Sequence, residues 1–154
     1  MDKFGKSQSV KRTEDVRFLT GEGRYVDDIT PSGALHGYFF RSPIAHGVIS
    51  ELDVADAAEA EGVHLILTCA DLEAAGIDIS MAGAVLKNRD GTRAADPLRP
   101  ILAKGKVRYV GEPVALIVAD PYAQARDAAE MILFDADDLP AKMDLTTGGA
   151  AGHQ

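Results

Sequence analysis

The sequence predicts an α+β fold, a mixed sheet with short helices packed into one domain. Apolar strand-like runs at residues 63–67 and 114–119 are each followed by a helix-start signal. An aromatic run at residues 35–42 ends at Pro43, as a strand should. The chain has 154 residues, of which 46% are hydrophobic and 26% charged. This composition is ordinary for a soluble globular protein, and the length suits one domain, two at most.

Residues 1–30 are predicted to form an extended arm, with one helical turn at residues 13–18. The arm carries Gly21 and Gly23, and no sustained hydrophobic period is found along it. A domain then covers residues 31–145. Residues 146–154 are small, polar and glycine-rich, and they should form a loose tail.

The first half of the domain reads as two strands, a helix and a third strand. The strands lie at residues 35–42 and 46–52. Asp53 stands where an N-cap would, and Gly62 can close the helix between them in the left-handed region. Residues 63–67 then form a buried strand.

A short helix and a long loop follow. Thr68 and Asp71 have capping spacing, and Gly76 ends the helix they open. Residues 76–105 contain no firm element, which is long for a compact domain. Such a segment either packs on a neighbour or is mobile.

The last third predicts a strand–helix–strand unit at about residues 107–135. A strand at 107–110 leads through Gly111-Glu112-Pro113 into the buried strand 114–119. Asp120 then offers an N-cap and Pro121 a first helical residue. The helix has one apolar face, formed by Tyr122, Ala125, Ala129 and Ile132. A further strand begins near the end of this helix.

Charge and cysteine usage exclude several classes of protein. The net charge is -8, which argues against nucleic-acid or anionic-membrane binding. One cysteine permits no internal disulfide, so a reducing cytoplasm is the expected location. No apolar run approaches the roughly 20 residues that span a bilayer. Cations are concentrated between residues 87 and 108, either as a partner surface or as solvated loops.

The residues show no self-contained active site. Gly21-Glu22-Gly23 begins like a dinucleotide fingerprint, but Val26 stands where the third glycine is needed. The histidines match no metal motif by spacing; they are His36, His46, His64 and His153.

Three further candidates each have a structural alternative. Cys69 is a possible nucleophile at a helix start, or a small core residue. Asp27 and Asp28 are a carboxylate pair for acid–base chemistry, or turn and cap residues. Glu112 is a functional acid on a rigid turn, or a turn residue at a strand bulge.

Three segments in order carry a family resemblance. They are residues 12–29 (RTEDVRFLTGEGRYVDDI), 41–46 (RSPIAH) and 107–115 (VRYVGEPVA). Together they resemble the beginning of the molybdenum-binding large subunit of the xanthine dehydrogenase, aldehyde oxidase and aerobic carbon monoxide dehydrogenase family. The resemblance covers roughly residues 10–145, and the long arm is most similar to the carbon monoxide dehydrogenase type.

The resemblance implies an α/β hammerhead domain over residues 31–145. It implies a parent oxidoreductase that uses molybdopterin, with iron–sulfur and FAD centres on partner domains or subunits. The family's pterin-binding residues and its glutamate base lie well after this domain, so no catalytic, cofactor-binding or metal residue is assigned to this chain. Residues 138–141 keep the family's Leu-Pro turn, whereas residues 134–137 match its strand imperfectly.

The expected function is therefore that of a structural or docking domain, without turnover in isolation. The expected partners are the molybdenum-binding domains and the iron–sulfur and flavin subunits. The candidate interface residues are Arg17, Phe18, Tyr25, Arg93 and Arg99. The alternatives are a free-standing binding or assembly protein that keeps only this domain, and a small enzyme that uses Cys69 or Glu112.

Overall fold

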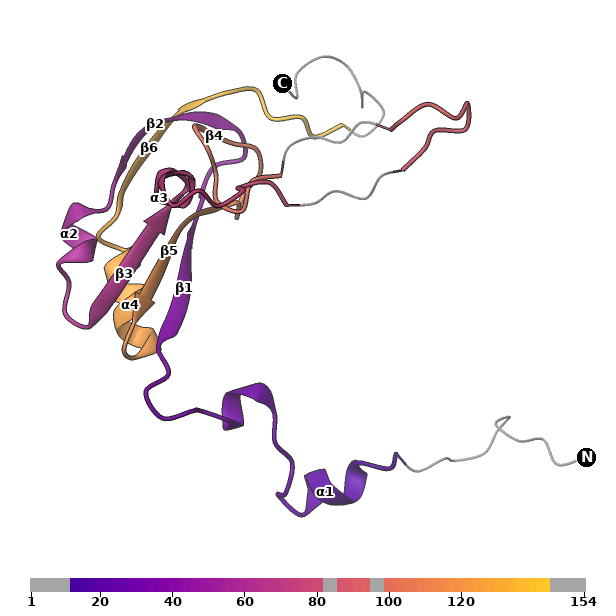
Figure 1. The fold of residues 1–154 in the computed structure, drawn as a ribbon, viewed down its shortest axis with the longest axis vertical. Helices are drawn as coiled ribbons and strands as arrows, with labels where there is room; N and C mark the ends of the chain where they lie inside the picture. Colours follow the sequence, from indigo (N-terminus) through magenta and orange to yellow (C-terminus); the bar gives the residue numbers. More distant parts are fainter. Residues whose placement is uncertain (1–11, 82–85, 95–98, 145–154) are drawn as a thin grey trace, which may run out of the picture. The chain divides into compact units, whose positions relative to one another are not determined.

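The computed structural model describes residues 12–81, 86–94 and 99–144 (Figure 1). They belong to two compact units, one that ends at Ala34 and one that begins at Leu35. The α+β class predicted from the sequence is confirmed, because short helices accompany two small sheets.

The first unit contains two short helices, α1 (Asp15–Leu19) and the 3₁₀ helix η1 (Val26–Asp28). Gly21 ends α1 with a φ of 74°, in the left-handed region that an L side chain rarely adopts. The amide of Gly21 donates to the Phe18 carbonyl, and the next amide donates to the Arg17 carbonyl. This pair of bonds is the Schellman motif, which satisfies the last carbonyls of the helix.

The second unit contains two three-stranded sheets whose pairs are all antiparallel. The order of the first sheet is β1-β5-β3 and that of the second is β4-β2-β6. Their bounds are β1 His36–Arg41, β2 Gly47–Asp53, β3 Val63–Thr68, β4 Lys106–Val107, β5 Pro113–Ala119 and β6 Leu133–Asp138.

The predicted strand–helix–strand unit is present as β5, α4 (Tyr122–Ala129) and β6. Its two strands lie in different sheets, so the unit links the sheets instead of building one of them. The helix begins after Pro121, whereas the sequence placed its first residue there. The predicted cap by Asp120 is wrong, because no side-chain bond caps α4 and the Asp120 carboxylate instead lies 3.0 Å from His64 Nε2.

Small side chains on α4 bring the helix close to the first sheet. Ala125, Ala128 and Ala129 are buried against a strand face that includes Ile117. Tyr38 and Phe40 pack against the same cluster, since alternate residues of β1 face the same side. Phe39 therefore points to the opposite face of this sheet.

A second cluster joins the two sheets. Val107 and Val114 are fully buried there, and Phe40 meets Phe134 edge to face at 5.6 Å between ring centroids. Two strands from different sheets thus share one core, which positions the start of β5 firmly.

Two predicted helices of the middle segment are present, with different lengths. The helix after Asp53 is only one turn, α2 (Ala55–Ala58), and Gly62 is left-handed with a φ of 77° as expected. The second helix, α3 (Cys69–Ala74), has the predicted capping pattern, because the Asp71 carboxylate accepts bonds from the amide and hydroxyl of Thr68.

The prediction of a buried third strand is wrong in part. Residues 64 and 65 of β3 are exposed, and Leu65 keeps 47% of its surface accessible. The reason is that β3 is an edge strand, and a bulge between Val63 and Leu65 interrupts its pairing with β5, so that His64 has no partner in the register.

Residues 76–105, predicted to lack a firm element, contain a hairpin within their described parts (Figure 1). The amides of Met81 and Ile101 donate across its legs to the carbonyls of Arg99 and Ile79. Nearer the tip, the amide of Ala94 donates to Leu86. Backbone bonds between its own legs therefore order this segment, a solution that hydrophobic periodicity does not reveal.

Candidate functional site

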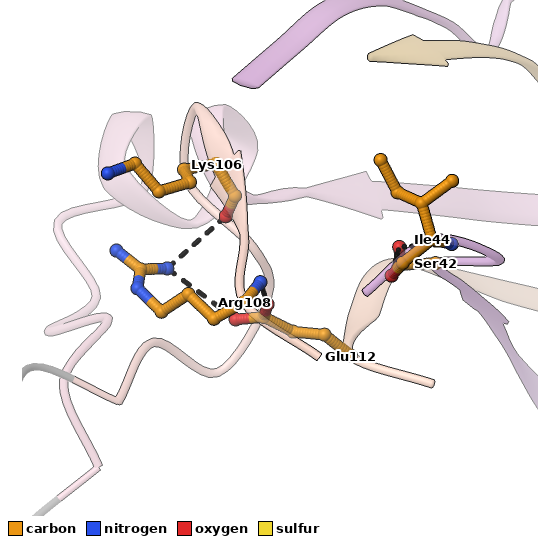
Figure 2. Close-up of polar contacts among 5 residues, drawn as sticks. All are labelled: Ser42, Ile44, Lys106, Arg108 and Glu112. Atoms are coloured by element: carbon orange, nitrogen blue, oxygen red, sulfur yellow. Dashed lines mark hydrogen bonds and ion pairs between the residues drawn. The ribbon is translucent and has the colours of Figure 1, made fainter. Parts of the chain in front are cut away.

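Two of the segments that carry the family resemblance meet in space. Ser42, just after β1, donates its amide to the Glu112 carbonyl at 2.9 Å. In return the Ser42 carbonyl accepts the Gly111 amide at 2.8 Å. The Ser42 hydroxyl also donates to the Ile44 carbonyl, as Figure 2 shows. The sequence thus folds so that residues 41–46 fix the turn that precedes β5.

Glu112 is the buried charge of this turn. Its residue is 3% exposed, and its carboxylate accepts the Arg108 amide and lies 3.6 Å from the Arg108 guanidinium (Figure 2). The guanidinium also donates to the Lys106 carbonyl at 3.2 Å. The carboxylate is therefore occupied by its own loop, which is the turn role given as an alternative to a functional acid.

The turn itself presents apolar side chains to solvent. The Glu112 amide donates to the Tyr109 carbonyl at 3.2 Å, and Gly111 has a φ of 87°. This combination matches a type II turn, which requires a left-handed third residue. Tyr109 is 54% exposed and Val110 is 64% exposed. The predicted strand at residues 107–110 is therefore wrong beyond Val107, because the chain turns there.

Arg41 connects this turn to the end of β1. Its Nη1 donates to the Gly111 carbonyl at 2.8 Å. Its Cζ lies 5.4 Å from the centroid of the Phe39 ring, a cation–π contact, and Phe39 is 40% exposed. We name the set Phe39, Arg41, Arg108, Tyr109 and Val110 the turn patch.

A shallow groove of about 350 Å³ borders the turn patch. It runs between β1 and α4 and is lined by Tyr38, Phe39, Phe40, Arg41, Arg126, Ala129 and Glu130. Because β1 is an edge strand, one side of its backbone faces this groove.

Three of the predicted interface residues lie together in the first unit. The rings of Phe18 and Tyr25 stack with centroids 5.4 Å apart and planes 9° apart. The Arg17 guanidinium lies 5.5 Å over the Phe18 ring. A Cβ at Gly23 would come within 2.4 Å of that ring, so the stack requires glycine there.

The other two predicted interface residues lie on the hairpin. Arg93 pairs with Lys87 in an isolated bridge, and the Arg99 carbonyl accepts the Met81 amide. Both arginines are exposed. They belong to the second unit, whereas Arg17, Phe18 and Tyr25 belong to the first.

The remaining sequence candidates have structural roles. Cys69 is buried, and this burial raises the pKa of its thiol, with the Glu73 carboxylate adding to the effect. A raised pKa disfavours the thiolate nucleophile. Asp28 accepts the Tyr25 amide as a cap, and Asp27 lies beside it in η1.

The described histidines do not converge. His46 Nδ1 lies 3.0 Å from the Pro140 carbonyl, while His64 faces Asp120. His36 begins β1. No group of three or more His, Cys, Asp or Glu side chains in residues 12–81, 86–94 and 99–144 could hold a metal ion. His153 lies outside the described residues.

The described residues also do not fit a molybdopterin cofactor. The groove beside β1 is small and shallow and mixes aromatic side chains with Arg41, Arg126 and Glu130, and the buried Glu112 is already bonded. Among the described residues, the one buried side-chain oxygen without a hydrogen-bond partner is Gln124 Oε1. It lies against Gly62, where an added Cβ would come within 1.7 Å of it. Among the described helices, none is long and apolar enough to cross a membrane.

Sequence reasoning had singled out Glu112 but not the residues that it positions. Tyr109 and Val110 were assigned to a strand at residues 107–110, and Arg41 to a strand at residues 35–42, so their exposure beside the turn was not predicted. A usable signal was present, since an apolar pair directly before Gly-Glu-Pro places large side chains on a turn, where solvent-exposed residues are usually polar.

Comparisons with known proteins agree with this architecture. Residues 20–140 match the family model described as aldehyde oxidase and xanthine dehydrogenase, a/b hammerhead domain. The nicotine 6-hydroxylase large subunit of Paenarthrobacter nicotinovorans is 44% identical over 88% of this chain and 16% of that protein. The carbon monoxide dehydrogenase large chain of Hydrogenophaga pseudoflava is 37% identical over 85% of this chain and 15% of its own length.

A solved structure gives the same result. Quinoline 2-oxidoreductase from Pseudomonas putida 86 superposes with a TM-score of 0.72 at 41% identity, over 86% of this chain and 16% of that one. The chain thus spans about 16% of the length of the relatives that it matches. Family model, relatives and fold all identify this chain as a member of the aldehyde oxidase and xanthine dehydrogenase family, matched along its a/b hammerhead domain.

Proposed function

We propose that this chain is a docking domain of a molybdenum hydroxylase large subunit and has no turnover of its own. The observation that carries the proposal is the match of residues 20–140 to the hammerhead domain, within relatives about six times as long. The internal bonding of Glu112 supports it as well, because this carboxylate, the most buried among the described residues, serves the fold.

The parent enzyme would be an oxidoreductase with a molybdopterin cofactor, and iron–sulfur and flavin centres would lie on partner domains or subunits. We assign none of these groups to the described residues, since they offer no fitting donor set. The cytoplasmic location stays a prediction from the single cysteine.

Two surfaces of this chain are proposed to meet the rest of the enzyme. On the arm, Arg17, Phe18 and Tyr25 form an ordered stack with exposed edges. On the hairpin, Arg93 and Arg99 are exposed cations on an otherwise acidic chain. Aromatic and arginine side chains are the types most enriched at protein interfaces.

The test is co-purification of this chain with the remaining domains of its large subunit, expressed as a separate polypeptide. The wild-type chain should be retained by the tagged remainder. We expect turnover of a substrate such as nicotine, quinoline or carbon monoxide only in the reconstituted enzyme. Failure of the wild-type chain to associate would contradict the docking role and favour a free-standing binding or assembly protein.

Charge reversal tests the hairpin surface separately. The double variant Arg93→Glu/Arg99→Glu should bind the remainder about tenfold more weakly at low salt, with a smaller difference at high salt. The control variant Arg93→Lys/Arg99→Lys keeps both charges and should bind like the wild type. Unchanged binding of the charge-reversed variant would show that Arg93 and Arg99 do not contribute to the interface.

A further inference from the structure

The turn patch has the composition of an interface centre. It gathers an exposed tyrosine and valine, a half-exposed phenylalanine and two arginines, and Arg41 touches both the turn and Phe39. Tyrosine and arginine dominate the residues that carry binding energy at interfaces. A cluster of exposed apolar side chains next to a groove is typical of an interaction site, whereas single exposed apolar residues are common on any protein surface.

The patch is also held rigidly before any partner arrives. Gly111 is bonded to Ser42 and Arg41, and Glu112 is bonded to Ser42 and Arg108. These bonds connect the turn to β1 and, through Pro113, to the buried start of β5. A side chain that is already oriented loses less conformational entropy on binding, so a preorganised patch gains affinity.

Its charge indicates the chemistry of the partner. Arg41 and Arg108 lie in the patch and Arg126 lines the adjoining groove, whereas Glu112 is buried in the turn and Glu130 is the carboxylate that lines the groove. Because Glu112 pairs with Arg108, the cationic character of the patch comes mainly from Arg41, with Arg126 in the adjoining groove, on a chain with a net charge of -8. A complementary surface carries carboxylates around an apolar recess.

We propose that the turn patch docks onto the remainder of the same large subunit, with Tyr109 and Val110 inserted into an apolar recess bordered by acidic side chains. We identify the partner as the rest of the large subunit because of the length of the relatives. About 84% of the sequence of each matched relative lies outside the part that this chain covers. This inference rests on the proposed function and adds the residues through which docking occurs.

The test compares two variants that remove similar apolar surface from different places. Tyr109→Ser/Val110→Ser alters the turn patch, and Met131→Ser/Leu133→Ser is the control on another exposed site. Urea unfolding should first show that both variants are folded. Calorimetry with the large-subunit remainder as titrant should then give binding at least about 30-fold weaker for the patch variant, and within about threefold of wild type for the control.

Each outcome has a distinct meaning. Wild-type binding together with equal binding by the patch variant would overturn this inference and leave the docking function standing. Absence of wild-type binding would overturn both. Concentration-dependent self-association that the patch variant abolishes, without binding to the remainder, would identify a second copy as the occupant and would also overturn the proposal.

Discussion

The turn at residues 108–112 and the hairpin at residues 79–101 show two ways in which this chain orders charged loops. In the turn, Glu112 is buried and bonded to the backbone and guanidinium of Arg108. At the root of the hairpin, Glu73 meets Lys104 at 2.6 Å, but these side chains are 42% and 53% exposed. We expect the two pairs to contribute differently, because water screens a pair that is exposed at both ends more than one whose carboxylate is buried.

The comparison separates a charge that is buried within the fold from charges that are exposed at its surface. The hairpin carries exposed Arg93 and Arg99 on legs bonded mainly to each other. The turn uses its charges internally and leaves apolar side chains outside. A rigid apolar tip beside Arg41 is suited to a specific contact, and exposed surface cations are suited to attraction at longer range.

The largest expected effect is that of Glu112→Ala. The substitution leaves the Arg108 amide and guanidinium without their buried acceptor, which should lower the free energy of unfolding by about 2–3 kcal/mol. Glu73→Ala is the matched control at the exposed pair, with an expected change below about 0.5 kcal/mol. Urea unfolding measures both, and equal losses would break the distinction between the two pairs.

Two glycines with the same backbone conformation extend the comparison between the turn and the hairpin. Gly111 and Gly91 have φ values of 87° and 84°, and a Cβ at either position meets nothing within 4 Å. The left-handed strain of Gly111→Ala should therefore lower stability by about 1–2 kcal/mol. Gly91→Ala carries the same strain, but its cost is limited to the small free energy needed to open the hairpin locally. Equal shifts of the urea midpoint would show that the hairpin unfolds with the core.

The cap of α3 gives a smaller, pH-dependent effect. Bonds from the hydroxyl and then the amide of Thr68 lower the pKa of Asp71. A carboxyl whose pKa is lower in the folded state stabilises the fold at pH values above its unfolded pKa of about 3.9. This contribution to stability is lost as the pH falls through the folded pKa.

Asp71→Ala should therefore cost about 0.5–1 kcal/mol at pH 7, with less difference from wild type below about pH 4. Chemical unfolding of both proteins at a series of pH values measures this. A difference that stayed constant down to pH 3 would show that the carboxylate charge is not the source.

The last prediction concerns the rate at which the Cys69 thiol reacts, and it involves no change in stability. Burial raises the pKa of the Cys69 thiol, so its thiolate is scarce near neutral pH. We expect a disulfide reagent such as DTNB to label Cys69 much more slowly in the folded chain at pH 7 than in urea. Rapid labelling without denaturant would reopen the nucleophile hypothesis.

Local signals in the sequence were sufficient for much of the fold. The capping spacing of Thr68 and Asp71 and the left-handed Gly62 and Gly76 are determined by neighbours along the chain, and the structure contains them. The division of β5 and β6 between two sheets was not predictable in this way. It depends on long-range pairing with β1 and β2, which a one-dimensional pattern does not encode.

The candidate site was predictable only in part. The motif around Glu112 was visible, and so was its role as a turn residue. That Ser42 and Arg41 would bond to Gly111, 70 residues away from Arg41, required the paired strands β1 and β5 to be known. The exposure of Tyr109 and Val110 follows from that packing, and hydrophobic period alone assigned them to a strand.

Hydrogen exchange tests the central claim, docking through the turn patch, most directly. Mass spectrometry would follow peptides spanning residues 107–114 in the free chain and in its complex with the large-subunit remainder. We predict at least about tenfold slower exchange in these peptides on complex formation, since bound backbone amides are excluded from water. Unchanged exchange there, with protection at other surfaces of the complexed chain, would contradict the claim.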